Sequence, residues 1–171
     1  MSTTLAVINR HRNVLLIDFA LLAGLYLLPS FSHMTAVPLY KLEPMRIALI
    51  IALLYTNRAN AYLIAFTIPL ASSWITGHPP PLKAVLMGIE FAVLVATYMH
   101  LVRKDRVPVF VALIAGILVG KAVYYSMKLV ALNADWLGGS LVSTPVQTQI
   151  LLAVGTAAVF ALVAHYRKPG S

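Results

Sequence analysis

Residues 107–132 read VPVFVALIAGILVGKAVYYSMKLVAL, and only Lys121 and Lys128 are charged in this stretch. An α-helix needs about 20 mostly apolar residues to cross a bilayer. This stretch is longer than that, and it lacks the alternation of polar and apolar residues that is typical of strands in a membrane β-barrel. It therefore predicts a membrane-spanning helix.

The rest of the chain has the same character, because 60% of its 171 residues are hydrophobic, 11% are charged and the mean hydropathy is +0.86. A soluble domain carries about 25% charged residues. The composition excludes a disordered chain and argues against a water-soluble enzyme. We expect one all-α integral membrane domain over residues 1–171. It should be a compact bundle of six transmembrane helices at residues 14–29, 44–56, 60–75, 82–102, 107–132 and 145–166.

The basic residues predict the orientation of the bundle. Eight of the 13 lysines and arginines fall on one side of the predicted helices: Arg10, Arg12, Arg58, Arg103, Lys104, Arg106, Arg167 and Lys168. The positive-inside rule then places both termini in the cytoplasm and the longer loops outside an inner (cell) membrane. Function concentrates in loops on a rigid scaffold, so we expect the chemistry to face outward. The net charge of +8 comes with no nucleic-acid-binding motif, so no nucleic acid partner is expected.

Charged residues inside the predicted helices are the main functional signal. A charge at the bilayer centre costs about 2.5–3.5 kcal/mol. Glu90 is expected about 12 Å below the outer end of its helix, at a depth similar to that of Lys121. The two form either an ion pair that joins two helices or part of a ligand site. One face of the helix at 107–132 carries Lys121, Tyr124, Tyr125 and Lys128. These side chains either face a polar ligand, or Lys128 and the two tyrosines extend to the lipid headgroups.

Several other positions have two open interpretations. Glu43 and Arg46 form a local ion pair, or Arg46 binds an anion at the helix start. His78, in a proline-rich loop, is solvated or contacts a ligand. Two pairs of small residues spaced four apart, Gly116 with Gly120 and Ala48 with Ala52, permit close approach of a neighbouring helix. Gln147 and Gln149 are two residues apart, so both cannot point inward.

Together, several stretches resemble the substrate-binding (S) subunits of energy-coupling factor transporters. They are PLYxxEPMR at 38–46, NAYL at 60–63, GHP at 77–79 before Lys83, then Glu90, and GKxxYY at 120–125. The resemblance covers roughly residues 14–166. It implies capture of a vitamin-like compound from outside, with a transmembrane coupling subunit and two ATPases as partners. Family members often carry Ala-x-x-x-Ala in the first helix, whereas the matching pair here, Ala48 and Ala52, is in the second.

We expect a substrate-capture subunit that binds a small polar or anionic solute, because the predicted site has an excess of basic residues. The expected substrate-binding residues are Tyr40, Glu43, Arg46, Asn60, Tyr62, His78, Lys83, Glu90, Lys121, Tyr124, Tyr125 and Lys128. The chain has no cysteine, no catalytic or nucleotide-binding motif and no histidine pair with metal-ligand spacing, so no cofactor is expected. The alternatives are an intramembrane enzyme or processing factor using Glu90, Lys121 and His78, or a structural subunit of a larger membrane complex.

Overall fold

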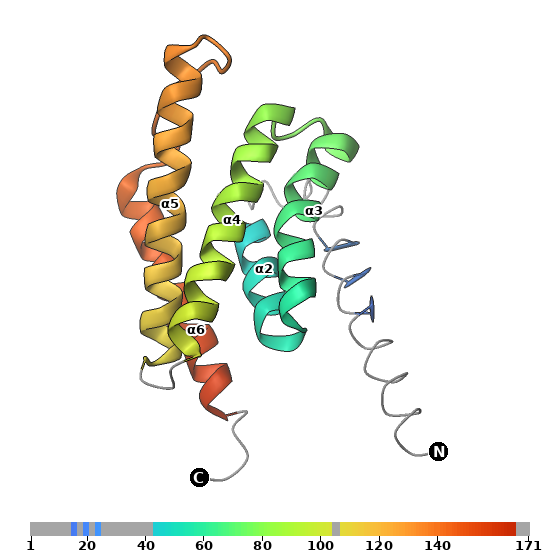
Figure 1. Ribbon diagram of the computed structural model, residues 1–171, viewed down its shortest axis with the longest axis vertical. Coiled ribbons are helices and arrows are strands. Elements are labelled where there is room, and N and C mark those ends of the chain that lie inside the picture. The colour runs from blue at the N-terminus through green and yellow to red at the C-terminus, as the bar shows by residue number, and fades with distance from the viewer. Residues whose placement is uncertain (1–14, 17–18, 21–22, 25–42, 104–106, 167–171) are drawn as a thin grey trace.

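The computed structural model describes residues 15–16, 19–20, 23–24, 43–103 and 107–166. All regular secondary structure in this part of the chain is helical, which confirms the predicted all-α class. The helices are α2 (Pro44–Tyr55), α3 (Arg58–Thr76), α4 (Pro81–Val102), α5 (Val109–Asn133) and α6 (Val146–Tyr166), as Figure 1 shows. Each helix begins and ends within two residues of its prediction. Most of the helix predicted at 14–29 lies outside the described residues, so the count of six helices stays a prediction.

Three of these helices, α4, α5 and α6, are long and apolar enough to cross a membrane. The second helix is different, because α2 has 12 residues. At about 1.5 Å per residue it is about 18 Å long, against about 30 Å for the hydrocarbon core of a bilayer. Although α2 is apolar, it therefore extends over only part of the thickness that α4 and α5 cover.

Proline and a capping residue explain where the helices begin. Pro44 and Pro81 occupy the first positions of α2 and α4, where a missing N–H costs no helical hydrogen bond. Asn57 caps α3, since its side chain accepts a hydrogen bond from the backbone N–H of Asn60 at 2.8 Å. Gly77, with φ of 70°, ends α3 in the left-handed conformation that glycine adopts without strain.

Helix α4 lies between α3 and α5, and α6 packs against α5 and α2 (Figure 1). The contact between α4 and α5 is close because α5 presents two glycines to it. A Cβ atom on Gly120 would lie 2.8 Å from the backbone oxygen of Glu90, and one on Gly116 would lie 3.0 Å from that of Leu94. The prediction that this pair admits a neighbouring helix is confirmed, and the neighbour is α4.

Candidate functional site

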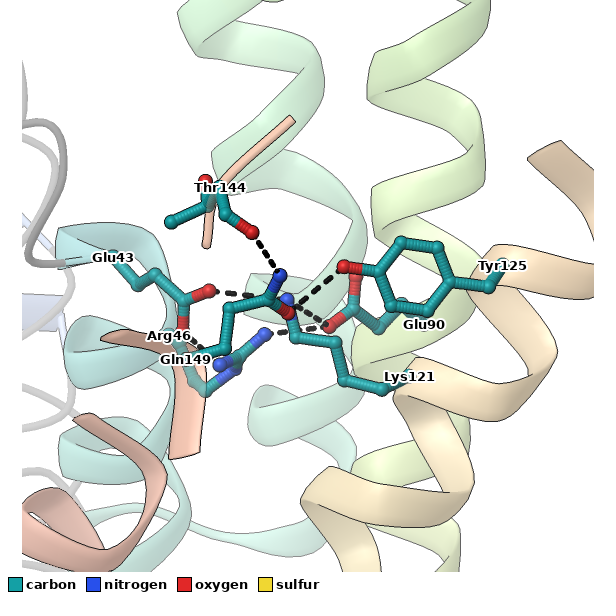
Figure 2. Close-up of polar contacts among 7 residues, drawn as sticks. All are labelled: Glu43, Arg46, Glu90, Lys121, Tyr125, Thr144 and Gln149. Atoms are coloured by element: carbon teal, nitrogen blue, oxygen red, sulfur yellow. Dashed lines mark hydrogen bonds and ion pairs between the residues drawn. The ribbon is translucent and has the colours of Figure 1, made fainter. Parts of the chain in front are cut away.

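Four charged side chains from three chain segments meet between α2, α4 and α5, and we call Glu43, Arg46, Glu90 and Lys121 the four-charge cluster (Figure 2). The Arg46 guanidinium donates one hydrogen bond to Glu43 and another, from Nη2, to Glu90 Oε1 at 2.6 Å. Lys121 Nζ donates to Glu43 Oε1 at 3.0 Å and lies 3.9 Å from Glu90 Oε1. Each cation therefore contacts both carboxylates.

The cluster lies near the middle of the long helices. Glu90 is the tenth of 22 residues in α4, and Lys121 is the thirteenth of 25 in α5. Because Glu43 and Arg46 touch these two side chains, the beginning of α2 lies at the same level. Helix α2 is thus a short helix whose N-terminus starts halfway along α4 and α5.

The backbone at this helix start is irregular. Glu43 has φ of 51° and ψ of 51°, the left-handed region that non-glycine residues rarely enter. Such a conformation costs on the order of 1–3 kcal/mol and persists where surrounding contacts over-determine it. Here the contacts are those of the Glu43 carboxylate with Arg46 and Lys121. At membrane depth, non-helical backbone is tolerated only where protein buries it or where it lines a water-filled cavity.

Burial divides the cluster into an inner and an outer pair. The side chains of Arg46 and Glu90 are each 5% exposed, whereas those of Lys121 and Glu43 are 19% and 20% exposed. Buried polar groups are nearly always hydrogen-bonded. The Nε of Arg46 is an exception, since it is buried and has no hydrogen-bond partner among the described residues. The Nε–H of Arg46 is therefore a buried donor that could hydrogen-bond a ligand.

A second polar group borders the cluster on the α5 and α6 side. The Tyr125 hydroxyl donates to Gln149 Oε1 at 2.8 Å, and Gln149 Nε2 donates to the Thr144 carbonyl at 2.7 Å (Figure 2). Lys121 Nζ lies 5.8 Å from the centre of the Tyr125 ring, within the range of a cation–π contact. Tyr125 therefore connects the cluster to the start of α6.

Lys128 is occupied by the loop between α5 and α6. Its ammonium donates to the carbonyls of Ser140 and Leu141, each at 2.8 Å, and to Ser143 Oγ at 3.1 Å. All three donors of the ammonium are then used. Lys128 is 3% exposed, so the interpretation that it extends to the lipid headgroups is wrong. It ties the loop back along α5.

The expected stripe on α5 lies on the inward face of the helix. Tyr124 and Lys128 are buried, and Lys121 and Tyr125 are half-buried. The expected Glu90–Lys121 contact is present at 3.9 Å, but the shorter contacts of both residues are with Arg46 and Glu43. The predicted local pair of Glu43 and Arg46 is present as well.

Besides the α5 residues described above, four further expected site residues lie outside the four-charge cluster. Asn60 and Tyr62 are in the first turns of α3, which follows directly after the C-terminal end of α2. The cluster is at the N-terminal end of α2, so the length of that helix, about 18 Å, lies between them. His78 is exposed in the α3–α4 loop, where its carbonyl accepts hydrogen bonds from the hydroxyls of α3 residues. Lys83 is half-buried near the start of α4 and forms no ion pair within the described ranges. Tyr40 lies outside the described residues.

The structure adds Gln149 to the site. Gln149 is buried and Gln147 is exposed, as their spacing of two residues requires. The sequence showed that only one of them can point inward but not which. Among the described residues, no group of three His, Cys, Asp or Glu side chains comes together that could hold a metal ion.

Comparison of the chain with protein-family models, with curated proteins and with solved structures finds no match in any of the three.

Proposed function

We propose that this protein is the membrane-embedded capture subunit of a transporter, and that it binds a small polar solute from the outer side at the four-charge cluster. The observation that carries the proposal is the short helix α2, which begins at the level of Glu90 and Lys121 and brings Arg46 to them. Transporters commonly place solute sites near the bilayer midplane, at the ends of interrupted helices.

The energetics of the cluster support a functional role. Four charged groups near the middle of a bundle are expensive to desolvate, and well-packed apolar residues often replace a buried ion pair without loss of stability. Apolar side chains would thus hold the helices together without the desolvation cost of four charges, so helix assembly alone does not require the cluster. The strained backbone of Glu43 also favours a binding site, as does the Nε of Arg46, which has no hydrogen-bond partner in the part of the chain that the structure describes.

The wider arrangement belongs to the same proposal. A six-helix bundle with both termini in the cytoplasm, in the inner membrane, would place the start of α2 below the outer loops. The chain carries no nucleotide-binding motif, so a transmembrane coupling subunit and ATPases would supply the energy, as the resemblance implies. Ala48 and Ala52 are 4% and 0% exposed, so the coupling subunit would have to bind elsewhere on the chain.

One observation favours a second function, that of a structural subunit. The four charges of the cluster pair with one another, so they can join α2, α4 and α5 without any ligand. An enzyme that uses Glu90, Lys121 and His78 has less support. Among the described residues, His78 is exposed in the α3–α4 loop and is hydrogen-bonded to α3 residues rather than to Glu90 or Lys121.

The test is to purify the protein in mild detergent, release any bound small molecule and identify it by mass spectrometry. We expect a polar compound in stoichiometric amount from the wild type, and its loss from Lys121→Ala. Lys83→Ala is the matched control, because Lys83 lies outside the cluster, and it should retain the compound. An empty wild-type protein, with Lys121→Ala folded normally, would favour the structural function. A compound that is chemically altered during incubation would favour the enzyme.

A further inference from the structure

The charge balance of the site bears on the kind of solute it accepts. Within the part of the chain that the structure describes, the cluster contains two carboxylates and two cations, so its net charge is zero. The two other lysines expected at the site are not members of the cluster and are not counted in this sum. Lys128 donates all its ammonium hydrogens to the α5–α6 loop, and Lys83 forms no ion pair with the cluster.

The two pairs of the cluster differ in how easily they can open. The Arg46–Glu90 pair is short and almost completely buried. The Lys121–Glu43 pair is about one-fifth exposed on both sides. Each of its members keeps a second partner when the pair opens, since Lys121 lies 3.9 Å from Glu90 and Glu43 is also paired with Arg46. Glu43 is also the residue with the strained backbone. A ligand that enters the cluster would therefore separate Lys121 from Glu43 and leave Arg46 and Glu90 paired beneath it.

Separating Lys121 from Glu43 exposes one positive and one negative group to the ligand. In a site with little water, a ligand with net charge would give the neutral cluster and the ligand together an uncompensated charge, which is strongly unfavourable. A ligand that carries both charges replaces one ion pair by two and preserves the neutrality of the site. We infer that the solute is a zwitterion of zero net charge, whose anionic group pairs with Lys121 and whose cationic group pairs with Glu43. This inference rests on the proposed function and narrows the polar or anionic solute expected from the sequence to a zwitterion.

The experiment is capture from a mixture. Full-length protein in mild detergent is incubated with a water-soluble metabolite extract, washed and analysed for enriched compounds by mass spectrometry. The double variant Glu43→Gln with Lys121→Met is the control that lacks the outer pair, and Lys83→Met is the matched control outside the cluster. Circular dichroism establishes that each variant keeps the helix content of the wild type. If the double variant does not fold, the single variant Glu43→Gln takes its place.

We expect the wild type and Lys83→Met to enrich a compound with one cationic and one anionic group, and the double variant to lose it. The affinity for the purified compound is then compared with those for two analogues, one lacking the anionic charge and one lacking the cationic charge. Each analogue should bind about 30-fold more weakly or worse, the usual effect of removing one partner of a buried charge pair. Enrichment of a compound with net charge, or unchanged affinity for either analogue, would overturn the inference and leave the proposed function intact. Enrichment of nothing by the wild type would overturn both.

Discussion

Gly120→Ala tests the close approach of α4 and α5 that brings Glu90 next to Lys121. The new Cβ atom would lie 2.8 Å from the backbone oxygen of Glu90. A backbone atom in a helix cannot rotate away as a side chain can, so the two helices must separate by several tenths of an ångström. Overpacking of this kind costs about 1–3 kcal/mol.

Gly155→Ala in α6 is the matched control, because a Cβ atom there would meet nothing within 4 Å. Both substitutions gain the same helix propensity, about 0.5–1 kcal/mol, so the difference between the two variants isolates the steric clash. We therefore expect Gly120→Ala to be about 1–3 kcal/mol less stable than Gly155→Ala. With about 2–4 °C per kcal/mol for a chain of this size, the midpoint of thermal unfolding should differ measurably.

The assay is thermal unfolding in detergent followed by circular dichroism, with Gly116→Ala as an intermediate case. Its Cβ atom would lie 3.0 Å from the backbone oxygen of Leu94. The expected order of stability is Gly155→Ala, then Gly116→Ala, then Gly120→Ala. Equal midpoints for Gly120→Ala and Gly155→Ala would refute the close approach of the two helices at Glu90.

Three further outcomes follow from individual contacts. Lys128→Met should release the α5–α6 loop and lower the free energy of unfolding by about 2–3 kcal/mol, because the charged hydrogen bonds are lost. Amide hydrogen exchange at residues 140–143 should be faster in this variant than in the wild type, and unchanged in the control variant Lys83→Met. Arg46→Met should cost about 3–5 kcal/mol in detergent unfolding, because the buried Glu90 carboxylate loses its 2.6 Å partner and keeps only the 3.9 Å contact with Lys121. Adding Glu90→Gln should restore part of that stability, and an additive double variant would contradict the pairing. Asn57→Ala should cost about 1 kcal/mol through loss of the α3 cap, and an unchanged unfolding midpoint would count against the cap.

The sequence predicted those features that depend on local pattern. Apolar run lengths, with prolines and glycines at their ends, gave the bounds of α2 to α6 to within two residues. The four-residue spacing of Gly116 and Gly120 predicted a close helix contact, and helix periodicity placed Lys121 and Tyr124 on one face. These inferences need only the geometry of a single helix.

The contacts between helices were harder to predict, because they depend on the relative levels of the elements. Nothing in the sequence shows that α2 begins halfway along α4, so the Arg46–Glu90 and Lys121–Glu43 pairs were not expected. The course of the α5–α6 loop was equally unreadable, and it decides that Lys128 binds carbonyls. Asn60 is expected at the site as part of the NAYL stretch at 60–63, and such a stretch gives no information on its distance from the other site residues.

The most direct measurement compares solute release from the wild type with release from a variant whose cluster carries no charge: Glu43→Gln, Arg46→Met, Glu90→Gln and Lys121→Met. Glutamine and methionine keep the approximate length of the side chains, and apolar replacement of a buried ion pair is often tolerated, so the variant should keep its helix content. Mass spectrometry of the released small molecules should find one polar compound per wild-type chain and none from the folded variant. An empty wild-type protein, or the same compound released in equal amount from both, would contradict the assignment of the four-charge cluster as a solute site.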